Sequence, residues 1–182
     1  MGNQGDTLVS QYLPAYAKLA MDGALYSVDM SGGTAKAPVA AAPTTSPEWM
    51  LYNASASEWM IVLLASATLV SGTAGLGYAL MGAAAIGVQT AVSADYSGTV
   101  KSRTDGSANK PDIFLTNNPT LIGGTPAWQT LAAIDKVAAV SVGAGLVAPV
   151  NGLLVAPPGG YGVAFEVVGP GGTAALFDVQ TL

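Results

Sequence analysis

The chain has 182 residues, which suits one domain or one domain with an arm, and its 51% of apolar residues suffice for a sizeable core. Only 9% of the residues are charged, against about a quarter in a typical domain, and the formal net charge is −5. Cysteine and histidine are absent, which excludes disulfides, thiol metal sites, cysteine nucleophiles and histidine bases, and the six Lys and Arg residues form no basic stripe for nucleic acid.

So low a charge content predicts self-association. A monomer with few charged residues has difficulty covering its surface with polar groups. Surface that lacks polar cover in the monomer is often an interface in an assembly. We therefore expect an oligomer or a lattice component.

Residues 1–23 are predicted to form an N-terminal arm or a short helix, and residues 24–182 a single domain. Asp6 is a candidate N-cap, and the apolar residues that follow have near-helical spacing, at Leu8, Tyr12, Tyr16 and Leu19. Asp6 also lies where a signal peptide would carry basic residues, so no signal peptide is expected.

The next part of the chain is predicted to contain three strands and a loop. Residues 24–30 alternate between apolar and polar, and residues 31–47 form a loop rich in Gly and Pro that we expect to be mobile unless a partner holds it. Residues 48–53 and 59–71 are predicted strands around a turn at 54–58. In the second strand the odd-numbered positions from Trp59 to Leu69 are all apolar, which predicts one face buried throughout.

The absence of charge from residues 59–94 raises the question of a membrane span. The apolar run ends at Ser71 and Gly72, and no Lys or Arg flanks the region. The sequence favours two buried strands joined by a glycine-rich turn, so no membrane contact is expected.

The second half of the chain is predicted to be strand-rich, with one short helix. Residues 93–112 are the most charged segment and indicate an exposed loop, with a short strand at 113–115. Thr125-Pro126 is typical of a helix start, and Trp128, Leu131 and Ile134 would form its apolar stripe. Brief apolar runs follow at 137–142, 147–150 and 152–155.

The last segment shows the clearest alternation. Apolar residues occupy every second position on both sides of the turn at 169–172, at Tyr161, Val163, Phe165, Val167, Phe177 and Val179. This pattern predicts a β-hairpin. Many short strands at this spacing predict an all-β fold, a jelly-roll-like β-sandwich of about eight short strands with at most one short helix.

No catalytic, cofactor-binding or metal-binding residues are predicted. Residues Gly143 to Ala148 match the dinucleotide fingerprint, with Glu166 at about the expected distance. The fingerprint requires a helix to begin there, and the Pro and Gly residues from Pro149 onward prevent one.

The acidic residues are expected to be solvated. Asp105 and Asp112 flank a turn, and Glu48 and Glu58 bracket a predicted hairpin, but neither pair has a signature of a glycosidase cleft. Loop oxygens from Asp95, Asp105 and Asp112 suit Ca²⁺, yet no EF-hand or repeat pattern accompanies them.

The aromatic residues divide into two groups. We predict that Trp59, Phe165 and Phe177 lie in the core. Trp49 and Trp128 are left open between a core position, a subunit interface and a stacking platform for sugars or bases.

Two stretches carry a family resemblance. One runs from Trp49-Met-Leu-Tyr-Asn through Trp59-Met-Ile-Val-Leu-Leu, and the other is Asn151-Gly-Leu-Leu-Val-Ala-Pro-Pro-Gly-Gly-Tyr-Gly-Val-Ala-Phe. Together, over roughly residues 48–182, they resemble the jelly-roll decoration or cement proteins of tailed-phage capsids. The resemblance implies a virion structural protein on the outer capsid surface that forms a homotrimer and binds between major capsid protein subunits. It implies no enzyme activity, cofactor or small-molecule substrate.

Under this interpretation residues 1–23 and 31–47 are predicted to make the capsid or inter-protomer contacts, because both are polar, proline-bearing segments with little reason to fold alone. The alternatives are another virion component (a tail, fibre or head-spike module) and a surface adhesive module. No internal repeat supports a fibre, and no secretion signal supports an adhesin.

Overall fold

The computed structural model describes residues 16–29, 35–75, 77–88, 100–102, 113–117, 121–122, 125–134, 142–170 and 173–182. Within these residues the chain is nearly all-β, as predicted, and its only helix is the five-residue α2 (Ala17–Met21). No helix of this part of the chain has the length and apolar character needed to cross a bilayer. The predicted charged loop at 93–112 and the apolar run at 137–141 lie almost wholly outside the described residues.

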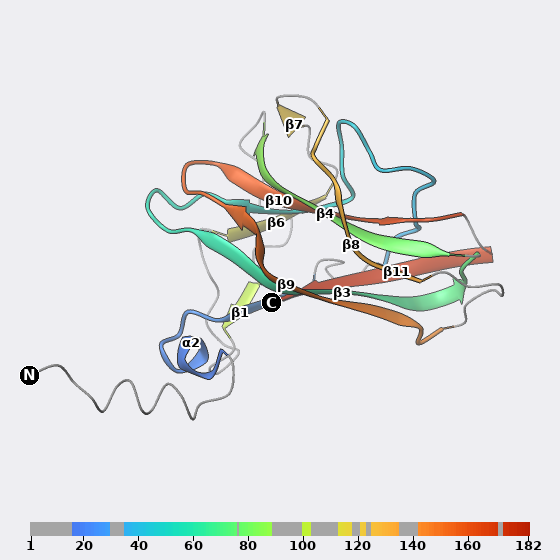
Figure 1. The fold of residues 1–182 in the computed structure, drawn as a ribbon, viewed down its shortest axis with the longest axis horizontal. Helices are drawn as coiled ribbons and strands as arrows, with labels where there is room; N and C mark the ends of the chain where they lie inside the picture. Colours follow the sequence, from blue (N-terminus) through green and yellow to red (C-terminus); the bar gives the residue numbers. More distant parts are fainter. Residues whose placement is uncertain are drawn as a thin grey trace, which may run out of the picture.

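The strands form two sheets that pack face to face (Figure 1). The first sheet has the order β5-β1-β11-β3-β9, and the second has the order β6-β2-β10-β4-β7, with β8 also paired to β4. The strands are β1 (Tyr26–Asp29), β2 (Trp49–Asn53), β3 (Met60–Thr73), β4 (Tyr78–Val88), β5 (Val100–Ser102), β6 (Ile113–Asn117), β7 (Leu121–Ile122), β8 (Gln129–Ile134), β9 (Gly145–Ala156), β10 (Tyr161–Val168) and β11 (Thr173–Thr181).

Eight of these strands have the connectivity of a jelly roll. Without the short strands β5, β6 and β7, the sheets read β1-β11-β3-β9 and β2-β10-β4-β8. Successive strands alternate between the sheets except at the step from β4 to β8, and this interleaving is the double Greek key of a jelly roll. The predicted jelly-roll-like sandwich is therefore confirmed.

The alternation between sheets shows that the predicted hairpins are wrong. β10 and β11, on either side of the turn at 169–172, belong to different sheets, as do β2 and β3 around residues 54–58. The turn residues predicted correctly that the chain reverses. They carry no information about the sheet in which the next strand finds its partner, because that depends on strands far away in the sequence.

The short helix predicted after Thr125-Pro126 is also wrong, because residues 129–134 form β8. This strand pairs antiparallel with β4, with Tyr78 opposite Ile134. The apolar spacing at Trp128, Leu131 and Ile134 fits a helix, but the edge of β4 offers unpaired backbone groups. Pairing with them satisfies the backbone and outweighs a weak local preference.

A bulge in β3 overturns two further predictions. The amides of Leu63 and Leu64 both donate to the carbonyl oxygen of Leu182, at 2.7 and 3.1 Å. Two residues of β3 therefore lie opposite the single residue Leu182. The extra residue reverses which alternate positions of β3 point into the core. The buried positions are Val62 before the bulge and Ala65, Ala67 and Leu69 after it. Trp59, predicted in the core, is therefore 63% exposed, and Ile61 is 52% exposed.

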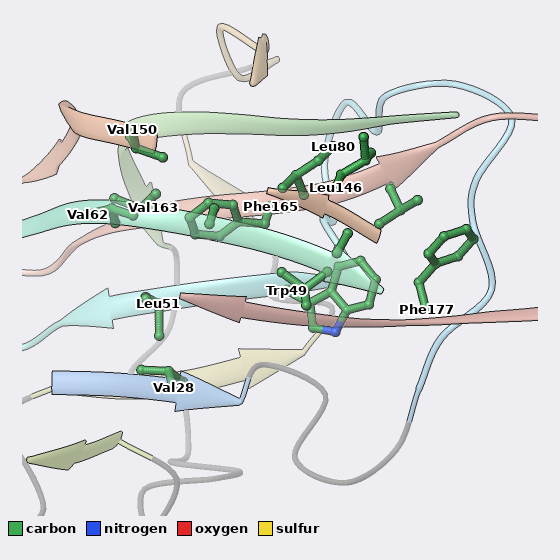
Figure 2. Close-up of a cluster of buried hydrophobic side chains, with 14 of the residues drawn as sticks. Val28, Trp49, Leu51, Val62, Leu80, Leu146, Val150, Val163, Phe165 and Phe177 are labelled. Carbon is green, nitrogen blue, oxygen red and sulfur yellow. The ribbon is translucent and has the colours of Figure 1, made fainter. Parts of the chain in front are cut away.

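The core lies between the sheets and is rich in aromatic side chains (Figure 2). Phe165 and Phe177 are fully buried, as predicted, and Trp49 proves to be a core residue as well. The ring of Tyr78 packs on that of Phe177, with centroids 4.8 Å apart. Because Trp49 and Phe165 are opposite each other on β2 and β10, they enter the core side by side from the second sheet.

Candidate interaction surface

The outer face of the second sheet is covered by the chain's own loops. Met50, Ala83, Leu121 and Ala164 form a small buried cluster, separate from the main core, against which Trp128 packs. The Trp128 Nε1–H donates to the carbonyl oxygen of Pro43 at 2.9 Å, and the Leu121 amide donates to that of Thr45 at 3.0 Å. Residues 43–45, 121–122 and 125–128 therefore form a second, shallow core on this side of the molecule.

The segment at residues 35–47 is bonded to both sheets. The amide of Lys36 donates to the Phe177 carbonyl oxygen of β11 at 2.9 Å, and the Val39 amide donates to that of Val167 in β10 at 2.9 Å. In Figure 1 this light-blue segment runs past the layer of β4 and β10. We call residues 35–47 the covering segment; the mobility expected for the whole loop at 31–47 stays a prediction.

Glu166 is buried on the covered face. Its carboxylate accepts hydrogen bonds from the amides of Glu48 and Val167, at 2.9 and 3.2 Å. Burial raises the pKa of Glu166 from its ordinary value of 4.5 to about 7, with a smaller rise from the charge of Glu48, while both hydrogen bonds oppose the rise. Glu48 itself lies 2.8 Å from the ammonium group of Lys36 in the covering segment.

Close packing over Gly162 shows how tightly the second sheet is covered. A Cβ atom at Gly162 would overlap the Met50 Cε and lie 2.8 Å from the Leu51 carbonyl oxygen. Met50 therefore lies directly over the β10 backbone. The glycine is required here by space, and a larger residue would displace either a buried side chain or a strand backbone.

The outer face of the first sheet is different along β3 and β9. Neither strand contains a charged residue. Five of the nine exposed large hydrophobic side chains among the described residues belong to β3, to β9 or to the residue before β3. We call this surface the β3–β9 face, and its large apolar members are Trp59, Ile61, Val70, Val147 and Leu153.

The two parts of this face lie on either side of a shift in the strand register. Val147 pairs with Ser66 and Ile61 pairs with Val155, and the register shifts between Val62 and Leu64. Both pairs point away from the core, because their strand neighbours are buried: Val62, Ala65, Leu146 and Leu154. Val147 and Leu153 are 66% and 69% exposed. Charged residues on this side are found at the neighbouring strands, where Asp178 of β11 pairs with Thr68 and Asp29 of β1 pairs with Gln180.

The free edge of β9 is poorly suited to adding a strand. Pro149 lacks an amide hydrogen, and Asn151 and Gly152 have left-handed φ angles of 50° and 81°. Both features interrupt an edge and oppose strand addition. The flat side of β9 is thus a better contact surface than its edge.

An apolar pocket of about 460 Å³ lies at one end of the sandwich, between α2 and the first residues of β3. Leu19, Trp59 and Ile61 contribute to it, together with core residues such as Val62 and Leu51. Tyr16 at the start of α2 donates its hydroxyl hydrogen to the Asn151 Oδ1 at 3.0 Å, which ties α2 to the end of the β3–β9 face.

The candidate chemical residues do not converge. Gly145 begins β9 where a dinucleotide site would need a helix, and Glu166 is buried on the other sheet. Glu48 and Glu58 lie beyond opposite ends of β2, and Asp95, Asp105 and Asp112 fall outside the described residues. In the part of the chain that the structure describes, no three acidic side chains are grouped for a metal ion.

The architecture is thus a jelly-roll sandwich in which the outer face of the second sheet is covered and the β3–β9 face of the first sheet is bare and carries no charged residue. No protein-family model, no curated protein sequence and no solved structure matches this chain.

Proposed function

We propose that the chain is a virion structural protein that decorates and stabilises a tailed-phage capsid by binding between major capsid protein subunits. The observation that most supports a protein working by assembly is the bare β3–β9 face, where apolar side chains are exposed on two strands without charged residues, in a chain of low total charge. The jelly-roll topology is the fold that the resemblance to decoration proteins implies.

Such a role requires only docking surfaces. A decoration protein that seals junctions between capsid subunits adds buried area at each junction. Repetition over the lattice then multiplies a modest affinity. The chain has no histidine or cysteine that would be needed for common forms of nucleophilic or acid–base catalysis, and this proposal asks for none.

The covering segment adds a second candidate contact on the opposite side of the molecule. It belongs to the proline-bearing loop for which we propose a capsid contact, and its backbone is bonded to both sheets. A segment held in this way loses little conformational entropy on docking. The proposal therefore places the capsid on the side of the second sheet and leaves the β3–β9 face for another partner.

Co-sedimentation with empty capsids of the same virus tests the proposal. The purified chain should pellet with the capsids at a saturating ratio and raise their melting temperature, because added interfaces stabilise the shell. If the chain stays in the supernatant at high micromolar concentration, the proposal is wrong.

A deletion of residues 1–23 tests the role assigned to the arm. We expect it to weaken capsid binding or self-association while the β-sandwich still unfolds cooperatively. Should both activities persist unchanged, the arm makes neither contact.

A further inference from the structure

We propose that the β3–β9 face packs against the same face of a second copy of this chain, in a two-fold sheet-on-sheet contact. This inference rests on the proposed function, since it names the partner of the face that the decoration role leaves open. It differs from the homotrimer that the family resemblance implies.

Charge is the first argument for a second copy as the occupant. The chain carries a net charge of −5, so most surfaces of two copies repel one another. β3 and β9 contain no charged residue, so their outer faces meet without like-charge repulsion and without burying an unpaired charge. Asp178 and Asp29 lie on the flank of the face and would remain at the rim.

Matching apolar surfaces are the second argument, and they decide the symmetry. A head-to-tail ring needs two different complementary patches on each copy, whereas a two-fold contact needs one patch that meets itself. Of the described surfaces, the outer side of the second sheet is already filled by the Met50 and Trp128 cluster. The partner that best matches the β3–β9 face within the chain is therefore the same face.

Size is the third argument. Strands lie about 4.8 Å apart and rise about 3.3 Å per residue, so two strands of 14 and 12 residues offer roughly 500 Å² with their side chains. Two copies would bury about 1,000 Å² in all, at the low end of specific interfaces. The dimer should accordingly be concentration-dependent and dissociate on dilution.

Packing geometry favours a contact through the β3–β9 face over one through the free edge of β9. Two sheets that meet on their apolar sides pack about 10 Å apart with interdigitated side chains. Val147 and Leu153 project from the face at two sites along β9, and the small neighbour Ser66 beside Val147 leaves room for a side chain of the second copy. Pro149 and the kink at Asn151 oppose continuous edge pairing.

Sedimentation equilibrium of the full chain between about 1 µM and 1 mM tests this inference. We expect the mass to rise from 18.1 kDa toward twice that value. Val147→Asp should weaken the association at least about tenfold, because it buries an unpaired carboxylate of each copy in an apolar contact. The matched control is Thr130→Asp, at an exposed position of β8 on the other sheet, which should dimerise like the wild type.

Each other result overturns the inference. A wild-type chain that stays at 18.1 kDa throughout, or one that forms a trimer, excludes the two-fold contact. A Val147→Asp variant that dimerises like the wild type, with its circular dichroism unchanged, places the contact elsewhere. If Val147→Asp loses capsid binding while its association is unchanged, the face belongs to the capsid. Capsid binding by the wild type is scored separately, so the decoration proposal can fail or survive independently.

Discussion

The two outer faces of the sandwich differ in how far their apolar side chains are shielded from water. Each sheet has apolar side chains on its outside, and apolar surface tends to be removed from water. On the second sheet, the covering segment together with Leu121 and Trp128 buries Met50 and Ala164 within the chain. On the first sheet, Val147 and Leu153 remain exposed. The comparison teaches that the covered face contributes to the stability of the monomer, while the uncovered face is available for the partner that we propose.

The largest expected effect comes from placing the same substitution on the two faces. Gly162→Ala should lower the free energy of unfolding by about 2–4 kcal/mol, because the new Cβ overlaps Met50 and approaches the Leu51 carbonyl oxygen. Gly145→Ala, on the bare face, puts a Cβ 3.4 Å from the Thr68 Oγ1, an ordinary contact. It should change stability by less than about 0.5 kcal/mol. Urea unfolding of both variants measures the difference, and equal costs would contradict it.

The second effect is a pH dependence that belongs to the covered face. The pKa of Glu166 is raised to about 7 in the folded chain, against an ordinary value of 4.5. Between these values the folded state holds a proton that the unfolded state has released, so stability falls as the pH rises. This group contributes its full stabilisation below pH 4.5 and loses it by about pH 7, a change of about 3 kcal/mol.

Glu166→Gln isolates this contribution. Because glutamine does not titrate, the difference in unfolding free energy between wild type and variant should change steadily from about pH 4.5 to 7 and be constant above. Urea unfolding at unit steps of pH measures it. Parallel curves for the two proteins would show that Glu166 has an unshifted pKa.

The smallest effect concerns one hydrogen bond of the covering segment. Trp128→Phe removes the Nε1–H donor to the Pro43 carbonyl oxygen and should cost about 1 kcal/mol. The matched control is Trp59→Phe, at a side chain that is 63% exposed on the bare face, where the unfolding free energy of dilute protein should be unchanged. If the control costs as much as Trp128→Phe, Trp59 is covered in the dilute monomer.

The sequence allowed the fold class to be predicted because period-two alternation is a local property. Phe165 and Phe177 follow that alternation and lie in the core as predicted. Strand partners are not local: the turn at 169–172 gives no sign that β10 and β11 join different sheets. Neither was the bulge at Leu63 and Leu64 visible, and a single extra residue there moved Trp59 from the predicted core to the surface.

One of the two properties of the β3–β9 face, its lack of charge, could be predicted from the sequence. Residues 59–94 and 137–165 contain no charged residue, so strands formed from them lack charge whichever strands they pair with. Their adjacency was not visible, because β3 and β9 are separated by most of the second sheet. The cover on the second sheet was missed for a similar reason: the bond from Trp128 to Pro43 joins two segments that look like ordinary loops.

The place of β11 in the first sheet has a consequence for synthesis on the ribosome. β11 lies between β1 and β3, yet it is translated after both of them. Until residues 173–181 emerge, β1 and β3 of the nascent chain lack the strand that joins them. Because the other ladders also connect distant parts of the chain, few stable local contacts form early. Folding of the first sheet should therefore be slow and wait for residues 173–181 to emerge, and chaperones would encounter a nascent chain with unpaired apolar strands.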